Sequence, residues 1–211
     1  MLSERDVRQR VEDSVKLLRE IEKSNEFKLV VDQDNIKVEK IPPPPFTGTY
    51  RMTGVVRSSA EKAFTALCDV KSIMKQSDTM VRCDVIQMFD EGKIKIMYQE
   101  HKSPITGISP RDFVNMSTYR KEEDGSYAIV NSGSSHPSYP ERPGYVRGQL
   151  HVSGYFIYPL TETTCKVVYF LRTDLKGWLP AWIVSFADKS FPETFKLTEQ
   201  TVLQYNNERV E

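Results

Sequence analysis

The chain has 211 residues, of which 39% are hydrophobic and 27% charged, a composition typical of a folded globular domain rather than of a disordered chain. Lysine and arginine together number 29, as do aspartate and glutamate, so the formal net charge is zero. This balance argues against a general nucleic-acid binder, which carries a basic excess or a basic stripe.

The first predicted elements are a helix and a hairpin. A helix over about residues 3–24 is predicted because five apolar residues recur at helical spacing, namely Val7, Val11, Val15, Leu18 and Ile21. The strands FKLVV and IKVEKI then flank Asp32–Asn35, which indicates a hairpin. Pro42–Pro45 follow as a stiff connector, and a ligand for an SH3-type partner is the alternative for this tetraproline.

The middle of the chain predicts mostly strands. TYRMTGVV is a third strand, and Ser58 or Ser59 then caps a short helix through AEKAFTALCDV. Because turn signals separate the later strands and no helix intervenes, we expect them to pair antiparallel. These strands are VRCDVIQMF, KIKIMYQEH, DFVNMSTYRKE, SYAIVNSG, YVRGQLHVSGYFIYPL and CKVVYFLRT.

The last predicted element is a long helix over residues 179–206, with a bend or break near Pro192, which lacks a backbone donor. Its broad apolar side includes Trp182, Phe186 and Phe195. The fold class is therefore α+β, with a curved antiparallel sheet of about nine strands. We expect residues 1–211 to form a single domain in which the last helix is a lid over the apolar face of the sheet.

Few residues suggest redox or metal chemistry. Three scattered cysteines, Cys68, Cys83 and Cys165, indicate reduced thiols and a cytoplasmic protein. The three histidines are not spaced as metal ligands, so neither a metal nor another cofactor is expected. The start of the chain lacks the apolar segment of a signal peptide.

Three motifs carry a family resemblance. ISPRDFV at 108–114, YVRG at 145–148 and TDLKGWLP at 173–180 resemble the START family of lipid-transfer domains, nearest to the small soluble members that carry sterols or bile acids. The resemblance implies a helix-grip fold, in which a curved sheet grips a C-terminal helix around a tunnel for one lipid. It also implies a non-enzymatic carrier that moves lipid between membranes. We expect a monomer that makes transient contact with membranes.

Candidate ligand contacts lie first on the strand KIKIMYQEH. If Ile94 and Ile96 face the interior, Tyr98 and Glu100 do too, because side chains alternate along a strand. The alternative is that the strand ends before Glu100, which then reaches solvent. Sterol carriers of the family resemble one another in pairing an acidic residue here with an arginine on the PRDFV strand. That arginine's position is Ser117, so the charged pair is absent as such.

The next two strands supply further candidates. Asn115 and Ser117 could anchor the polar head of an otherwise apolar ligand, and the alternative is that they form a solvent-facing polar face. In CKVVYFLRT the odd positions are the more apolar set, so Tyr169 and Leu171 are expected to face inward. Lys93 and Lys95 are expected to point outward.

The loop 131–145 and the two tryptophans are candidates for a moving part. The loop, which contains His136 and Tyr139, matches the position of the family's omega loop, so we expect a gate with an exposed tyrosine tip. An ordinary surface loop is the alternative. Gly177 and Pro180 suit a hinge; Trp178 is expected to be a core anchor, and Trp182 to cover one end of the tunnel.

Together these features predict a carrier that binds a single lipid, with a sterol or steroid-like molecule favoured. A phospholipid or bile-acid carrier is the nearest alternative. An enzyme of the cyclase or thioesterase kind is less favoured, because no nucleophile elbow or Gly-rich phosphate loop is present. A ligand-controlled interaction module is a third class.

Overall fold

The computed structural model describes residues 3–42, 48–75, 77–103, 105–180 and 182–208, with side chains in the last range described from residue 190 onward. Most of the tetraproline segment, Pro43–Pro45, therefore lies outside the described residues, and its predicted role as a connector stays a prediction.

Four α-helices and ten strands make up the described chain. The helices are α1 (Glu4–Glu22), α2 (Ala60–Cys68), α3 (Val70–Lys75) and α4 (Trp182–Asn207), with a 3-10 turn, η1, at Asp90–Gly92. The strands are β1 (Lys28–Gln33), β2 (Ile36–Ile41), β3 (Thr49–Val56), β4 (Met80–Phe89), β5 (Ile94–His101), β6 (Arg111–Lys121), β7 (Tyr127–Gly133), β8 (Val146–Arg147), β9 (Gln149–Pro159) and β10 (Cys165–Asp174).

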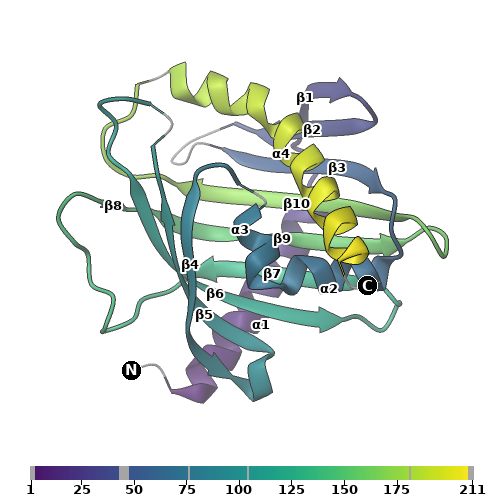
Figure 1. Ribbon diagram of the computed structural model, residues 1–211, viewed down its shortest axis with the longest axis horizontal. Coiled ribbons are helices and arrows are strands. Elements are labelled where there is room, and N and C mark those ends of the chain that lie inside the picture. Colours follow the sequence, from purple (N-terminus) through teal and green to yellow (C-terminus); the bar gives the residue numbers. More distant parts are fainter. Residues whose placement is uncertain (1–2, 43–47, 76, 104, 181, 209–211) are drawn as a thin grey trace.

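The strands form one curved sheet in the order β1-β2-β3-β10-β9-β7-β6-β5-β4, and every neighbouring pair on this path is antiparallel. The predicted curved antiparallel sheet with a C-terminal helix is thus confirmed (Figure 1). Two details differ from the predictions: the short helix α3 was not predicted, and the single strand predicted over 145–160 is divided into β9 and the short β8, which pairs parallel with β6.

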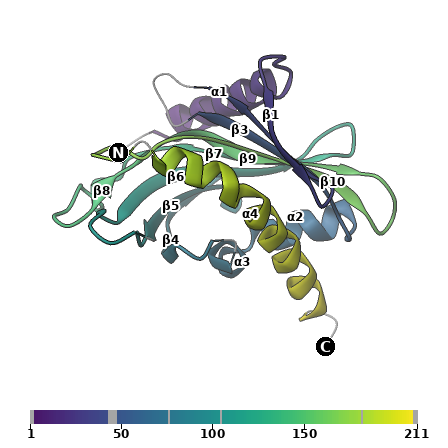
Figure 2. The same cartoon turned by 90° about the horizontal axis from the view of Figure 1, so that it is seen from above.

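Helix α1 forms where the sequence predicts it. Ser3 and Asp6 make a reciprocal capping box at its N-terminus, which satisfies backbone groups that the first turn leaves free. The five predicted apolar residues are all buried and pack on β6, β7 and β9. Helix α1 therefore covers the outer, convex face of the sheet (Figure 2).

Helices α2, α3 and α4 lie on the opposite, concave face (Figure 2). Helix α4 is continuous through Pro192, and Figure 1 shows it bent rather than broken. Phe195 of α4 is buried directly over Gly54 of β3, where an added Cβ atom would lie 2.5 Å from the phenyl ring. A residue without a side chain at position 54 therefore lets the helix sit close to the sheet.

Polar contacts fix the C-terminal part of α4 to its surroundings. Lys196 forms an ion pair with Asp34 of the β1–β2 turn at 2.8 Å. Asn206 donates from Nδ2 to Ser58 Oγ at 3.0 Å, just before α2. These contacts and the buried Phe195 hold α4 against the β1–β3 end of the sheet and against α2, with which it packs.

Candidate functional site

The two faces of the central strands are packed differently. On the convex face, Val130, Val152 and Phe156 are almost completely buried beneath α1. On the concave face, the neighbouring side chains of Tyr119, Asn131, Tyr169 and Leu171 keep part of their accessible surface, although α2 and α4 lie on this side. These four side chains therefore stay partly accessible on a face that two helices cover.

Polar side chains cross the middle of the concave face, and we call them the polar band. Ser117 of β6 donates from Oγ to Asn131 Oδ1 of β7, and Asn131 Nδ2 lies 3.5 Å from Ser153 Oγ of β9. Beside them, Asn115 Nδ2 donates to Gln99 Oε1 of β5 at 2.8 Å. The polar band therefore consists of neutral amide and hydroxyl groups on neighbouring strands: Gln99, Asn115, Ser117, Asn131 and Ser153.

One atom of the polar band has no partner. Asn115 is 5% exposed, and in the part of the chain that the structure describes its Oδ1 accepts no hydrogen bond. An unsatisfied buried acceptor costs about 1–3 kcal/mol, so such atoms are uncommon in native proteins. A hydroxyl group of a bound molecule would satisfy this acceptor.

Aromatic residues form the apolar surface next to the polar band. The rings of Tyr155 and Tyr169 stack with centroids 4.5 Å apart, and the Tyr119 ring packs against the same core. Burial raises the pKa of Tyr169 to about 12, and burial also raises the pKa of Tyr155 and Tyr119. These hydroxyls therefore stay neutral at physiological pH, and the surface suits an apolar ligand.

Two of the predicted ligand contacts, Tyr98 and Glu100, point away from the concave face. Tyr98 belongs to the apolar cluster beneath α1, together with Ile94 and Ile96, and Glu100 lies on the same side. The predicted inward orientation of Tyr98 and Glu100 is therefore wrong. Both faces of β5 carry buried residues. The alternation of Ile94 and Ile96 identifies one buried face of the strand, but this face packs on α1 and not on the concave side.

Glu100 and Asp112 instead take part in ion pairs on the convex side. Glu100 pairs with Arg82 at 3.1 Å and Arg142 at 2.8 Å, and Asp112 pairs with Arg147 at 2.9 Å. Burial raises the pKa of the Asp112 carboxyl, but hydrogen bonds from Arg147 and Tyr98 outweigh this effect and hold the pKa below its usual value. The carboxylate is therefore charged and fully paired.

The other candidates divide into two groups. Asn115, Ser117, Tyr169, Leu171 and Phe195 lie on the concave side, as predicted. The side chains of Trp182 and Phe186 lie outside the described residues, so their predicted contacts stay predictions. Gln99, Asn131 and Ser153 were missed, because only the strand register shows that they adjoin Asn115 and Ser117.

The predicted gate loop lies against the convex face. Tyr139 is half-buried, with its ring 4.7 Å from that of Tyr98, and His136 packs edge-on against it at 5.9 Å. The expectation of an exposed tyrosine tip is therefore wrong. Arg147 donates to the Tyr139 and Pro140 carbonyl oxygens at 3.2 Å while it pairs with Asp112, so one guanidinium group ties the loop to β6.

Trp178 also differs from its prediction as a core anchor, because its side chain is 76% exposed. It follows Gly177, whose φ of 66° is a left-handed conformation that favours glycine. Arg111 donates to the Leu175 and Lys176 carbonyl oxygens at 3.3 and 3.1 Å. The segment that leads into α4 is thus fixed at its base and presents a tryptophan to solvent.

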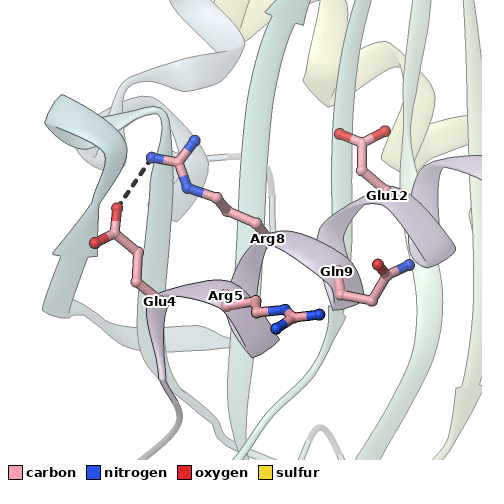
Figure 3. Close-up of a pocket in the computed structure, with 5 residues that line it drawn as sticks. All are labelled: Glu4, Arg5, Arg8, Gln9 and Glu12. Atoms are coloured by element: carbon pink, nitrogen blue, oxygen red, sulfur yellow. Dashed lines mark hydrogen bonds and ion pairs between the residues drawn. The ribbon is translucent and has the colours of Figure 1, made fainter.

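A surface hollow lies elsewhere, along the first turns of α1 (Figure 3). It is lined by one helix alone and is largely charged, with Arg8 and Glu4 paired at 3.0 Å. An open hollow lined only by charged and polar side chains does not suit a lipid, so it does not compete with the concave face as a lipid site. Among the described helices, none is long and apolar enough to cross a membrane.

Comparison with known proteins identifies relatives over almost the whole chain. A family model described as START domain matches residues 7–209. StAR-related lipid transfer protein 5 of Mus musculus is 27% identical over 198 residues, which cover 91% of this chain and 93% of that protein. The structure of human StAR-related lipid transfer protein 5 matches with a TM-score of 0.86 at 25% identity, covering 97% of this chain and 100% of that one.

A second solved structure agrees in fold. The crystal structure of human STARD10 matches with a TM-score of 0.82 at 20% identity, over 98% of this chain and 82% of that chain. At this identity the match concerns the architecture alone.

Replacing Arg147 with methionine tests the role of the Asp112 ion pair. Removing one partner of a buried pair leaves the other charge uncompensated, so we expect the free energy of unfolding at pH 7 to fall by about 3–5 kcal/mol. Because the folded-state pKa of Asp112 is lowered, its stabilising effect is present above the unfolded pKa and is lost as pH falls through the folded pKa. The difference between variant and wild type should therefore shrink below about pH 4.

Urea unfolding across this pH range measures the effect, and Arg57→Met is the control. Arg57 pairs with Glu199 but its side chain is 75% exposed, so its loss should change stability by less than about 0.5 kcal/mol. Equal destabilisation by the two variants would show that the Asp112 pair has no special role.

Proposed function

The chain belongs to the START domain family, and on this premise we propose that it binds a single lipid between the concave sheet face and α4 and carries it between membranes through the cytosol. The favoured cargo is a sterol or a steroid-like molecule. The protein acts by binding rather than by catalysis: the apolar face replaces the bilayer around the lipid, and the polar band fixes the polar end.

The unsatisfied Oδ1 of Asn115 is the observation that carries this proposal. The polar band lies beside the aromatic residues Tyr119, Tyr155 and Tyr169, which matches a ligand with one polar end and an apolar body. A rigid sterol has this distribution, and it loses little conformational entropy on binding. Its hydroxyl would donate to the Asn115 oxygen.

The ionisable groups of the concave side favour binding over an enzymatic role. Burial raises the pKa of the Cys68 thiol to about 12 and lowers the pKa of His101 to about 4, so both are neutral at physiological pH. A thiol with a raised pKa is a poor nucleophile, because the thiolate is the reactive form. A thiol and an imidazole that are both uncharged and half-buried support a carrier rather than an enzyme.

Membrane contact is proposed for the segment around Trp178. A tryptophan ring is favourable at the membrane interface, because its body is apolar and its N–H group can stay hydrated. The segment leads directly into α4, which covers the proposed binding face. Contact of this segment with a bilayer would therefore occur close to the place where the lipid must enter. We propose that the loop 131–145 moves with it as a gate, with His136 and Tyr139 leaving the convex face as the Arg147 contacts break.

Asn115→Leu tests the polar contact. The variant keeps a similar volume but removes the acceptor, so a sterol should bind about fivefold more weakly, the effect of one neutral hydrogen bond. Titration of a fluorescent sterol with a free hydroxyl, compared with its methyl ether, gives the measurement. The ether should bind both proteins alike.

Thr118→Val is the matched control, since Thr118 is equally buried but lies on the α1 side of the same strand. It should leave sterol affinity unchanged. Unaltered affinity in Asn115→Leu, with the melting temperature of the wild type, would remove Asn115 from the site.

Trp178→Ser tests membrane contact. The side chain is already exposed in the free protein, so stability should not change, whereas partition onto liposomes should fall by about tenfold as one large apolar group is lost from the interface. Liposome flotation measures the partition. Leu160→Ser, an exposed residue in the β9–β10 turn at the other end of the sheet, is the control (Figure 1). A similar loss in both variants would argue against a specific contact at Trp178.

A further inference from the structure

Arg111 is a buried arginine whose hydrogen-bond partners are all carbonyl oxygens. It is 8% exposed, and its guanidinium group donates to the carbonyl oxygens of Ser109, Leu175 and Lys176 at 2.5, 3.3 and 3.1 Å. Among the described residues it forms no ion pair, and burial lowers the pKa of Arg111 from its usual value, because no nearby anion offsets the lost hydration. A buried cation therefore lacks a described counter-ion at the base of the segment that leads into α4.

Two carboxylates near Arg111 are already paired with other cations. Asp112, the next residue, pairs with Arg147 at 2.9 Å, and Asp174 pairs with Lys176 at 2.8 Å. A guanidinium group has five N–H groups, and three of those of Arg111 serve the carbonyl oxygens, so one remains on each terminal nitrogen. Two parallel donors of this kind match the oxygens of a phosphate group.

Ser109 presents a hydroxyl group beside this guanidinium group. Its carbonyl oxygen lies 2.5 Å from Arg111 Nη1, its side chain is exposed, and its hydroxyl makes no hydrogen bond within the described parts of the chain. Ser109 and Pro110 lie between the turn at 105–108 and the start of β6, outside any helix or strand. A protein kinase can therefore bind this stretch without unfolding a regular element.

The residue after Ser109 indicates the class of kinase. The chain contains two Ser-Pro pairs, Ser103-Pro104 and Ser109-Pro110, and no Thr-Pro pair. Proline-directed kinases modify a serine or threonine that directly precedes a proline. Ser103 is the less suitable site, because it is half-buried and its hydroxyl donates to the Ile105 carbonyl oxygen at 2.9 Å. Ser109 is therefore the accessible site of the two.

We propose that Ser109 is a phosphorylation site for a proline-directed kinase, and that its phosphate is the counter-ion of Arg111. In the reaction the Ser109 Oγ forms a bond to the γ-phosphorus of ATP as the bond to ADP breaks, and the hydroxyl proton passes to the catalytic aspartate of the kinase. The phosphate carries a charge of about −1.5 to −2 at pH 7 and accepts hydrogen bonds from the two remaining N–H groups of Arg111.

Phosphorylation at this position keeps the protein away from anionic membranes. Arg111 holds the carbonyl oxygens of Leu175 and Lys176, and a paired guanidinium group holds them more firmly. The new negative charge lies close to the segment that carries Trp178, so an anionic bilayer repels it. The phosphate contact follows from the Arg111 geometry alone, whereas its effect on membrane contact rests on the proposed function.

Incorporation of phosphoserine at one chosen position tests the contact without a kinase. Ser109→phosphoserine should raise the melting temperature by about 3–10 °C, the effect of one charge-assisted contact in a chain of this length. Ser103→phosphoserine is the matched control and should give no rise. In a protein that also carries Arg111→Gln, phosphoserine at position 109 should give no rise over Arg111→Gln alone.

Phosphorus NMR gives a second measurement that does not depend on the folding of Arg111→Gln. A neighbouring guanidinium group favours the dianion, so the pKa of the phosphate at position 109 should lie below about 5.5. The phosphate at position 103 should keep the ordinary value of about 6. Equal phosphate pKa values at the two positions, without a difference in melting temperature, would overturn the ion pair.

The kinase assignment is tested on the wild-type chain. Treatment with ATP, Mg²⁺ and a purified proline-directed kinase, followed by peptide mass spectrometry, should place phosphate at Ser109, and Ser109→Ala should remove it. Phosphate at Ser103 alone, or no phosphate on the wild type, would contradict the assignment.

Liposome flotation tests the effect on membranes. Ser109→phosphoserine should lower partition onto liposomes that contain anionic lipid by about tenfold, with a smaller fall on neutral liposomes. Unchanged partition, in protein whose melting temperature has risen, would overturn the regulatory role and leave the phosphate contact in place. Wild-type protein that neither partitions onto liposomes nor retains lipid would instead count against the carrier function.

Discussion

The central strands of this sheet are covered on both faces, and this constraint shapes the rest of the molecule. A polar side chain on such a strand is removed from water, so it must find a partner or leave a group unsatisfied at a free-energy cost. Helix α1 packs on the convex face with an apolar interior, which supplies stability. The concave face is thereby free to carry amide and hydroxyl groups, one of which, the Asn115 oxygen, has no partner in the described structure.

Charged side chains are also distributed unequally between the two faces of the sheet. Carboxylates and guanidinium groups pair on the convex side, where they hold the loop 131–145 against β5 and β6. Arg111 similarly fixes the segment before α4. The concave side holds neutral tyrosines, amides and hydroxyls, with Lys95 beside the Tyr119 ring. A bound lipid would therefore contact the concave face without disturbing the ion pairs that anchor the moving segments.

Sequence periodicity predicted the elements better than it predicted orientation. The apolar stripe of α1, the strand order along the chain and the C-terminal helix with Pro192 all follow from local patterns. Alternation along β5 separates its two faces, but it does not say which one meets α1, because both carry buried residues. The predictions of an inward Glu100 and an outward Lys95 are therefore wrong. The missed residues Gln99, Asn131 and Ser153 depend on strand register, which long-range pairing decides.

The most direct test of the account is the lipid content of the protein after contact with membranes. The purified chain would be incubated with liposomes that contain sterols, steroid acids, phospholipids and sphingolipids, re-isolated, and analysed by native mass spectrometry. One bound lipid for each chain, from the sterol and steroid-acid classes, is the predicted result. Protein that returns without lipid from every class would contradict a carrier function for the concave face.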